Sequence, residues 1–342
     1  MARNQGPFAN WSQYLAARLG AMGLTMFNVD ANLRTAAMIG RGMYHFDKRH
    51  RQRARAAIAR AFPEFDAQRI DQITRDSFEH FIKLAFEVLH TPRVMQLDTW
   101  AQRIDIDNLG QSLAMLGRRE PAILLTGHLG NWEVYGYFLA LMGYDVDAIA
   151  RPIDNPLIND WLLGIREAKG MRIITKWDAT ERMLKVLGRG GSLAFIADQN
   201  AGDKGMFVPF FGRLASSYKS IGLLAISQNV PVICGFAHRA DPDPLTGQVY
   251  RYQMGVADVI RPEDWVDQPD PLYYVTARYA RAIETMVCRR PEQYLWMHRR
   301  WKSRPRYERQ GKPMPRSLRR NLEQLPWMDD ALMRRLEQPT EG

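Results

Sequence analysis

Short apolar runs alternate with segments of helical periodicity in the second half of the chain. Apolar runs of four to six residues, as expected for buried strands, occur at 122–125, 146–150, 171–174, 193–197 and 231–236. Segments with helical spacing of apolar residues occur between and after them, at 131–142, 157–169, 179–187 and 219–228. This succession of βα units predicts an α/β fold, with a mainly parallel sheet, helices on both faces and right-handed crossovers.

The first hundred residues lack this alternation and are mostly helical in pattern. Between residues 66 and 89, apolar side chains such as Ile70, Ile73, Phe78 and Phe81 recur at helical spacing. We therefore predict an N-terminal helical, membrane-associating region at 1–100 and an α/β domain at 101–310. A C-terminal basic tail with a short helix is predicted at 311–342.

The N-terminal helical pattern does not predict a membrane span, because the chain has no run of 18 apolar residues. The nearest candidate, residues 11–27, is interrupted by Arg18. This pattern favours an amphipathic helix that lies in a membrane interface, with peripheral or monotopic attachment. The same arginine argues against a signal peptide.

The net charge of +10 has its source in one segment. From Arg289 to Arg320 there are twelve Lys or Arg and two acids, Glu292 and Glu308, so the rest of the chain sums to zero. Such a segment suits anionic lipid headgroups or an acidic protein. It would also suit nucleic acid, but no RRM, KH or OB signature accompanies it, so we expect no nucleic-acid partner. A second basic run, at 48–60, is interleaved with alanines and predicts a helix with one solvated face.

The two cysteines, Cys234 and Cys288, are too few and too far apart for a disulfide framework and fit a reducing cytoplasmic setting. Neither CxxC nor HExxH occurs, so the usual zinc spacings are absent. We expect neither a metal nor another cofactor.

A histidine and a glutamate stand where the first predicted strand gives way to a helix. His128 follows Thr126-Gly127 on the strand-to-helix loop, Gly130 permits a tight turn, and Asn131 can cap the helix. Glu133 falls in the first helical turn, where it can accept a hydrogen bond from the imidazole. We therefore predict that Glu133 orients His128, leaving the other ring nitrogen free to accept a proton from a hydroxyl. An ordinary His–carboxylate pair without catalytic work is the alternative.

Two further polar residues follow strands of the predicted sheet. Arg151 comes after the second strand and Asp198 after the fourth. Because parallel strands end at one edge of a sheet, where ligands collect, the topology can bring both to the edge that carries His128. Taken singly, each residue is better explained by a structural position, Arg151 as a surface residue before a helix that begins with proline and Asp198 as the start of a loop.

Five stretches together resemble the bacterial lipid A biosynthesis acyltransferase family, in its His-x4-Glu version. In order, they are TGHLGNWE, ARPIDNP, ADQNAGDKGMFVPFFG, ASSYKSIGLLA and PEQYLWMHRRWK, which span about 121–302. The resemblance implies a glycerolipid-acyltransferase-like fold. It also implies transfer of a fatty acyl group from a thioester, on acyl carrier protein or coenzyme A, to a hydroxyl of a glycolipid. The acceptor that the resemblance implies is a lipid A precursor, at the cytoplasmic face of the inner membrane.

The resemblance also implies roles for single residues. His128 would be the base, Glu133 its partner, Arg151 a phosphate or acceptor ligand, and Asp198 a carboxylate that shapes the site. Asn131 would also contact the substrate. The chemistry further requires donors for the charge on the thioester oxygen, either backbone N–H groups at the helix that opens at Asn131 or a cation.

The basic segment at 289–320 and the predicted loop at 199–217 are candidates for substrate binding. Arg299, Arg300 and Lys302 suit an anionic lipid or an acidic carrier protein. The predicted long loop at 199–217 carries Met206, Phe207, Phe210 and Phe211. They either line an acyl-chain groove or plug the core.

Other functions remain open on the sequence. The chain lacks the FPEGTR block of the glycerol-phosphate acyltransferases, which argues against a glycerolipid acceptor. A phosphatidylinositol-mannoside or lysophospholipid acyltransferase stays within the class. Two alternatives lie outside the acyltransferases: a thioester hydrolase, and a non-catalytic basic protein that binds membranes.

Overall fold

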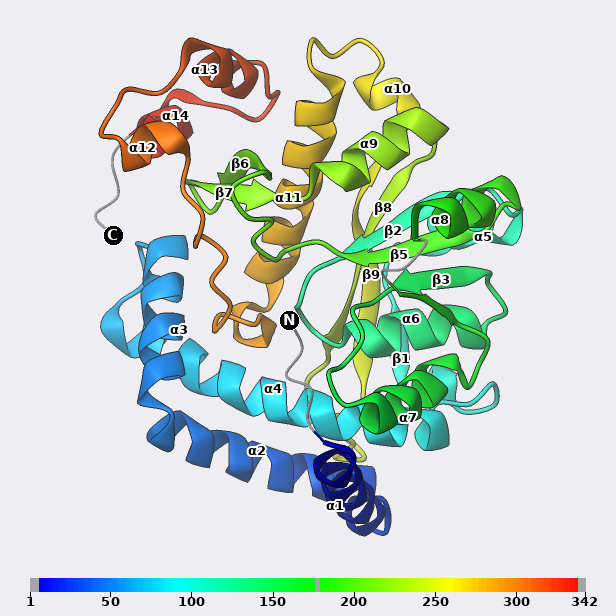
Figure 1. Cartoon of the computed structure of the whole chain (residues 1–342). Helices are drawn as coiled ribbons and strands as arrows, with labels where there is room; N and C mark the ends of the chain where they lie inside the picture. The colour runs from blue at the N-terminus through cyan, green and yellow to red at the C-terminus, as the bar shows by residue number, and fades with distance from the viewer. Residues whose placement is uncertain (1–5, 176–178, 338–342) are drawn as a thin grey trace.

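A single mixed sheet runs through the centre of the molecule (Figure 1). The structure, a computed structural model, describes residues 6–175 and 179–337. In spatial order the seven strands are β1 (Ile104–Ile106), β9 (Tyr252–Ile260), β8 (Val232–Arg239), β2 (Ala122–Thr126), β5 (Ser192–Ile196), β3 (Val146–Ile149) and β4 (Arg172–Ile174). The five strands from β8 to β4 are parallel, and β1 and β9 run in the opposite direction.

Both faces of the sheet are buried, as the apolar runs predict. Ile123 and Leu125 of β2 belong to one core, together with residues of α9 (Lys219–Gln228) and α11 (Pro271–Arg289). Ala122 and Leu124 belong to a second core, with residues of α6 (Trp132–Leu141). Because successive side chains of a strand point to opposite faces, a strand buried on both sides reads as one continuous apolar run. Further helices around the sheet are α5 (Gly110–Gly117), α7 (Pro156–Glu167), α8 (Ala179–Gly188) and α10 (Pro262–Trp265).

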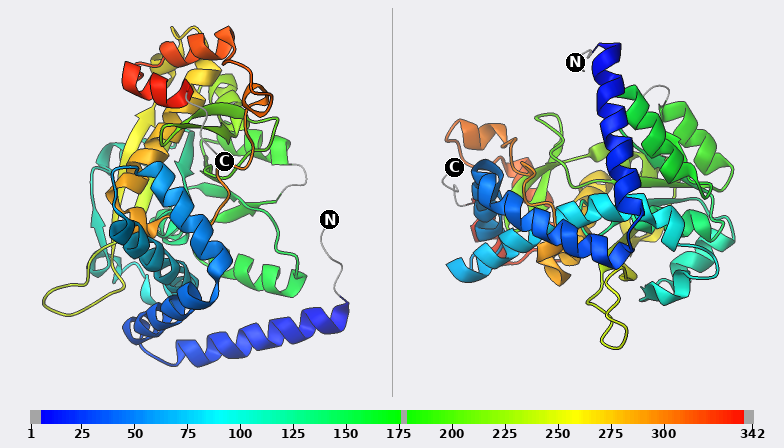
Figure 2. Two further views of the ribbon diagram at one scale, coloured as in Figure 1. Left: turned by 90° about the vertical axis from the view of Figure 1, so that its left-hand side faces the viewer. Right: turned by 90° about the horizontal axis from the view of Figure 1, so that it is seen from below.

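In the described part of the chain, four α-helices precede the sheet. They are α1 (Pro7–Thr25), α2 (Val29–Phe46), α3 (Lys48–Ala61) and α4 (Ala67–Val94), and α2 lies along α4 (Figure 1). Helix α3 buries Ala54, Ala57, Ile58 and Ala61 against the first core and leaves its arginines on the other side. Helix α1 lies at the edge of the molecule, as Figure 2 shows, where it contacts α7 and α4. Within the two described ranges, no helix combines the length and the apolar character that crossing a membrane requires.

The C-terminal part is more ordered than a tail with one short helix. It forms α12 (Arg306–Arg309), α13 (Arg316–Glu323) and α14 (Asp330–Glu337). Leu322, Leu325, Met333 and Leu336 are buried in the first core, which explains why these basic helices stay attached to the domain. The ends of the predicted terminal regions, 1–5 and 338–342, lie outside the described residues.

The five predicted strands and four predicted helices of the α/β part are all present, with bounds shifted by at most three residues. The prediction of a long loop at 199–217 was wrong in its second half. That half is a hairpin of β6 (Met206–Phe210) and β7 (Arg213–Ser217). Its two-residue turn has positive φ at Phe211 and Gly212, and a phenylalanine at such a position is not a recognisable turn signal. Phe210 and Phe211 are buried in the first core, so they act as core residues.

Candidate active site

A tight loop carries His128 from the end of β2 into α6. Gly130 turns the chain with φ +54°, and a β-carbon there would lie 2.1 Å from the carbonyl oxygen of Ala237 on β8. No side chain fits at this point, so glycine lets the loop press against the sheet. The loop then reaches α6, whose first turn is capped by Asn131.

Residues from the C-terminal part of the chain hold this loop in place. The N–H of Gly130 donates to the carbonyl of Gln293 at 2.9 Å, and the N–H of Leu295 donates to the carbonyl of His128 at 3.0 Å. The N–H of Asn131 donates to the carbonyl of Ala237 at 2.7 Å. The backbone on both sides of the histidine is therefore hydrogen-bonded to elements that are distant in sequence.

The side chain that orients His128 is Asp198, at the end of β5, the strand beside β2. Its Oδ1 lies 2.7 Å from Nδ1 of the imidazole, and its Oδ2 accepts the backbone N–H of His128 at 2.9 Å. An ionised carboxylate only accepts hydrogen bonds, so Nδ1 carries the proton and Nε2 is left with a lone pair. The sequence analysis placed Asp198 at the correct edge but did not identify it as the hydrogen-bond partner.

Burial and charge act against each other in this pair. Burial alone would raise the pKa of the Asp198 carboxyl, but the charge and hydrogen bonds of His128 outweigh it and lower that pKa to about 2. Burial likewise would lower the pKa of His128, yet Asp198 and, more weakly, Glu133 raise it above its usual value. The imidazole is thus a stronger base than a free histidine.

The predicted hydrogen bond between His128 and Glu133 was wrong. Glu133 instead accepts two hydrogen bonds from Arg166 of α7, from Nε at 2.9 Å and from Nη2 at 2.5 Å. This bidentate ion pair is mostly buried, with 26% of the Arg166 side chain and 15% of the Glu133 side chain exposed. The sequence suggested that Glu133, five residues after His128, would face the imidazole, whereas in the fold a guanidinium from another helix pairs with this carboxylate. Glu133 acts on His128 only through its charge.

The prediction that Asn131 contacts substrate is not supported by its position, because the residue is fully buried. Its side-chain oxygen accepts the N–H of Val134, as the cap prediction requires, and its amide nitrogen donates to Glu87 of α4 and to Tyr252 of β9. Asn131 therefore ties the start of α6 to the N-terminal helices and to the sheet.

Glu87 connects this cap to a larger buried network. Its carboxylate accepts the Nε–H of Arg239 at 2.5 Å, and that guanidinium also lies 2.8 Å from Nδ1 of His80. Nε2 of His80 lies 3.1 Å from the carbonyl of Gly130. Burial and Arg239 lower the pKa of His80 well below its usual value, so this histidine is neutral. Through the carbonyl of Gly130, this network contacts and supports the loop of His128.

Arg151 lies beyond the end of β3, at the same sheet edge as His128 and two strands away from β2. Its side chain is exposed. The structure thus confirms the shared edge but does not bring Arg151 into hydrogen-bond contact with the His128–Asp198 pair.

The three basic residues of the C-terminal segment differ in exposure. Arg300 is 3% exposed and donates to the carbonyl of Ser216 at 2.5 Å and to the hydroxyl of Ser217 at 2.6 Å. It therefore ties the C-terminal segment to β7. Arg299 and Lys302 are exposed and remain available to a ligand.

Sequence reasoning missed His298. Its ring centroid lies 4.8 Å from that of His128, and burial with the neighbouring imidazole lowers the pKa of His298 to about 4. The residue stands inside a stretch used for the family resemblance, but nothing in its spacing pointed to His128. Two other neighbours were missed: the ring of Trp132 packs 5.0 Å from that of His128, and the amide nitrogen of Gln199 lies 3.4 Å from Nε2.

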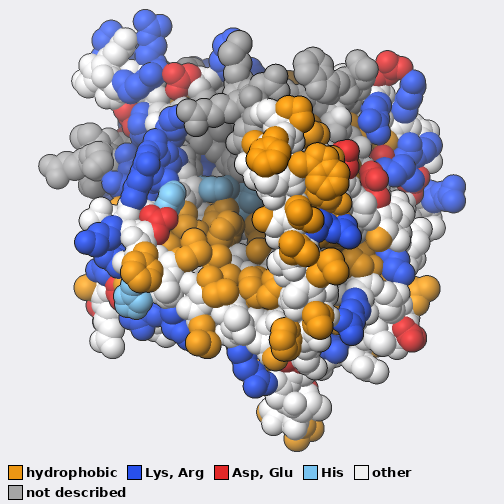
Figure 3. Space-filling model, turned by 60° about the horizontal axis from the view of Figure 1, so that its bottom comes forward, with side chains coloured by type: hydrophobic (Ala, Val, Ile, Leu, Met, Phe, Trp, Pro, Cys, Tyr) orange, Lys and Arg blue, Asp and Glu red, His pale blue; other side chains and the backbone are white. Residues whose placement is uncertain are grey.

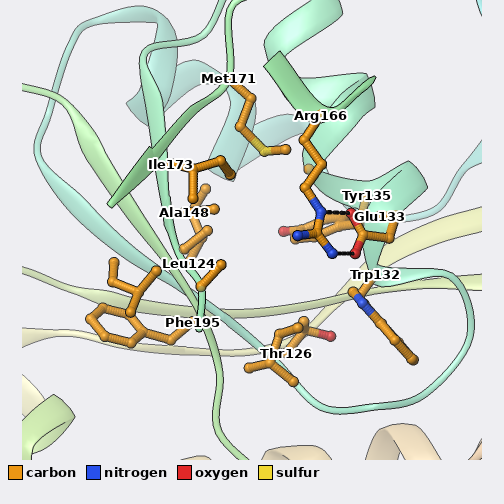
Figure 4. Close-up of a pocket in the computed structure, with 15 residues that line it drawn as sticks. Leu124, Thr126, Trp132, Glu133, Tyr135, Ala148, Arg166, Met171, Ile173 and Phe195 are labelled. Carbon is orange, nitrogen blue, oxygen red and sulfur yellow. Dashed lines mark hydrogen bonds and ion pairs between the residues drawn. The ribbon is translucent and has the colours of Figure 1, made fainter. Parts of the chain in front are cut away.

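An apolar pocket of about 80 Å³ opens between the sheet and α6 and α7, with the Glu133–Arg166 ion pair on one side (Figure 4). Its walls include Leu124, Ala148, Met171, Ile173 and Phe195. Thr126 and Trp132, on either side of His128 in the chain, also line it. The pocket therefore lies next to the loop that carries His128, although the imidazole itself does not line it.

No group of three or more His, Cys, Asp or Glu in the described ranges is arranged to hold a metal ion.

Comparison with known proteins identifies the family of the chain. The chain matches the bacterial lipid A biosynthesis acyltransferase family over residues 9–303. It is 23% identical to a lipid A biosynthesis lauroyltransferase of Escherichia coli (strain K12) over 275 residues, which make up 78% of this chain and 84% of the relative. It is 25% identical to a lipid A biosynthesis palmitoleoyltransferase of the same organism over 269 residues, 76% of this chain and 81% of the relative. The family match covers most of the chain, which also places a mostly buried His–Asp pair at the edge of its sheet, and it leads to one assignment: the chain is an enzyme of the bacterial lipid A biosynthesis acyltransferase family.

Proposed function

We propose that this enzyme moves a fatty acyl group from an acyl thioester to a hydroxyl of a glycolipid, a lipid A precursor, with His128 as the general base. The observation that carries the proposal is the pairing of Nδ1 with Asp198, because it keeps a proton on Nδ1 and leaves the lone pair on Nε2. The contact of Nε2 with the amide nitrogen of Gln199 is long, at 3.4 Å, and an acceptor hydroxyl would replace it. The fold is proposed to be of the glycerolipid-acyltransferase type.

The reaction needs a base but no nucleophile from the enzyme. As the acceptor oxygen attacks the thioester carbon, its proton passes to Nε2 of His128, and the carbonyl oxygen takes up negative charge. Collapse of this intermediate breaks the C–S bond, and the departing thiolate takes the proton from the imidazolium. Asp198 stabilises the imidazolium in between, and general-base help of this kind is worth about 10²–10⁴-fold.

The developing oxyanion requires hydrogen-bond donors near His128. The first turn of α6, which opens at Trp132, offers backbone N–H groups and the positive end of a helix. Gln199 adds a side-chain N–H group near the imidazole. Removing one such donor typically costs about 10²–10³-fold in rate.

The apolar pocket supports binding of the acyl chain. Its volume of about 80 Å³ is small beside the roughly 300–1,000 Å³ of typical ligand sites, so it suits the inner part of a chain whose remainder lies outside. Small residues keep it open: a β-carbon at Gly136 would lie 3.0 Å from the sulfur of Met171. The relatives named for lauroyl and palmitoleoyl transfer show that chain length varies within the family.

The outer face of α1 supports attachment to a membrane surface. One row of its large apolar side chains, continued just past its end, is 49–88% exposed: Phe8, Trp11, Leu15, Leu19, Met22 and Met26. The opposite side of the helix packs on α7, where the ring of Tyr14 meets that of Trp161 and Asn155 donates to the carbonyl of Asn10. Figure 3 shows hydrophobic side chains gathered on this side of the molecule around a hollow that contains histidine. We place this face on the cytoplasmic side of the inner membrane, with acyl carrier protein or coenzyme A as the donor's carrier.

Mass spectrometry of reaction products tests the proposal. Purified protein is incubated with acyl carrier protein and coenzyme A thioesters and a bacterial lipid extract, beside His128→Ala. A glycolipid that gains one acyl mass only with the wild type is expected. Free fatty acid without a new lipid would identify a hydrolase, and no turnover by the folded wild type would reject catalysis.

A further inference from the structure

A basic groove leads away from the catalytic histidine. Its cavity measures about 410 Å³, and seven Lys or Arg side chains line it. Arg53 and Arg60 come from α3 and Arg213 from β7, and the remainder come from the segment at 299–304. None of the described residues that line it is acidic. The basic run of α3 and the basic C-terminal segment, far apart in sequence, thus face one cavity.

Most cations of this groove have no acidic partner among the described residues. The exception is Arg304, which is paired with Glu308 at 2.6 Å. Burial and the charges of Arg304 and Arg60 lower the pKa of Arg213 to about 10. Burial and Arg299 likewise lower the pKa of Arg53. Such mutual repulsion is relieved when an anion enters.

Buried polar atoms without a partner gather in the same place. Among the described residues, Nε of Arg213, Nδ1 of His298, Nε of Arg300 and Nε1 of Trp301 are buried and lack a hydrogen-bond partner. All four residues line the groove. Buried N–H groups are nearly always paired in folded proteins, so these unpaired atoms in residues of the groove wall favour a bound ligand that accepts hydrogen bonds.

We propose that the groove binds a phosphate monoester of the acyl acceptor and thereby positions its hydroxyl at His128. This deepens the proposed function and rests on it. A phosphate monoester carries up to two negative charges on a small set of acceptor oxygens, and it pairs with arginines through several short hydrogen bonds. A concave cavity with buried donors suits such a group better than it suits the convex surface of an acidic carrier protein.

The groove adjoins the site of transfer through His298. This residue lines the groove, and its ring centroid is 4.8 Å from that of His128. An acceptor held by its phosphate among Arg53, Arg60 and Arg213 would extend past His298 toward Nε2. The proposal therefore assigns acceptor recognition to residues on α3 and β7 that are separate from the acyl pocket.

Binding of simple phosphates tests the groove without catalysis. Calorimetry with glucosamine 1-phosphate and with inorganic phosphate compares the wild type with the double variant Arg53→Met/Arg213→Met. The matched control is Arg320→Met, an exposed arginine of the basic segment that does not line the groove. We expect at least tenfold weaker binding in the double variant, unchanged binding in the control, and no binding of unphosphorylated glucosamine. Equal binding by all three proteins, or none by the wild type, would overturn the proposal.

Kinetics then separate an acceptor phosphate from a donor phosphate. With a phosphorylated glycolipid and an acyl-pantetheine donor, which lacks phosphate, we expect the KM for the acceptor to rise at least tenfold in the double variant. The kcat should stay within about threefold, and a dephosphorylated acceptor should behave alike with both proteins. A rise in the KM of acyl-coenzyme A or acyl carrier protein alone would assign the groove to the donor and overturn the proposal.

Two precautions keep the test decisive. Arg53→Met alone is the second variant if the double variant does not fold, as judged by its melting transition. If the wild type transfers no acyl group, the proposed function fails, whereas the calorimetry still decides whether the groove binds phosphate.

Discussion

The imidazole of His128 is held by the carboxylate of Asp198, 70 residues farther along the chain, at 2.7 Å. Replacement by asparagine keeps the size of the side chain but removes its charge, and an amide can donate to Nδ1 and stabilise the wrong tautomer. We expect Asp198→Asn to fold and to lose about 10²–10⁴-fold in kcat/KM. Steady-state kinetics measure the loss. Asp203→Asn, at an exposed position in the same loop, is the control and should be fully active.

The pH profile provides an independent check of this pairing. Asp198 raises the pKa of His128 above its usual 6.5, so the base is protonated and inactive at low pH. We expect kcat/KM of the wild type to fall as pH decreases through a pKa above 6.5. In Asp198→Asn the raising influence is lost while burial still lowers the pKa, so this acid limb should move to lower pH. An acid limb at the same pH in both proteins would show that another group controls it.

The Glu133–Arg166 ion pair is expected to support the wall of the apolar pocket. Glu133→Gln leaves a mostly buried guanidinium without its charge partner, so we expect a folded protein that is destabilised by about 1–3 kcal/mol. A double-mutant cycle with Arg166→Met should show a coupling free energy of about 1–2 kcal/mol in denaturant melts. The exposed pair Glu181–Lys185, with both side chains 70% exposed, is the matched comparison and should show almost none. Equal coupling in the two cycles would contradict the supporting role.

The pocket should determine chain length. Ala148 lies on its wall, so Ala148→Met would fill much of the space beside the sheet. With a mixture of acyl thioesters of different length, we expect mass spectrometry to show a shift toward shorter chains. Ala225→Met, a substitution of equal size at a buried position in the other core, controls for overpacking and should leave the preference unchanged. The same product distribution in all three proteins would place the acyl chain elsewhere.

The exposed row on α1 should mediate binding to lipid. Leu19 and Met22 are each 58% exposed, and burial of such a side chain in a membrane contributes about 1.5–3 kcal/mol. We expect Leu19→Glu/Met22→Glu to bind anionic vesicles at least tenfold more weakly in co-sedimentation. Leu245→Glu, at a 94% exposed position in a distant loop, is the control. Unchanged binding by the double variant would assign attachment to the basic surface alone.

The fold was readable from the sequence because buried parallel strands leave long apolar runs. Position 123 and its neighbours in β2 are apolar on both faces, which few other elements require. The edge strand β1 was not predicted, since it has only three residues and a mixed burial pattern. The hairpin of β6 and β7 was missed because its turn begins with Phe211 and not with a residue that favours positive φ.

The partners within the site were harder to predict than its location. The position of Glu133, five residues after His128 in the first turn of α6, favoured it as the partner of the imidazole. In the structure this carboxylate is paired with Arg166 from α7. Whether Asp198 or Glu133 faces the imidazole depends on how adjacent strands end, and a single sequence does not record this. His298 reaches the site through the docking of a distant segment, which leaves no periodic signal.

The loop of His128 forms backbone hydrogen bonds with Gln293 and Leu295, which are synthesised long after the loop itself. During synthesis β2 and α6 leave the ribosome well before these residues. The nascent chain then contains His128 but lacks the backbone hydrogen bonds that hold its loop. The same holds for any fragment that ends before Gln293. The backbone hydrogen bonds around His128 are therefore complete only after Leu295 has been synthesised.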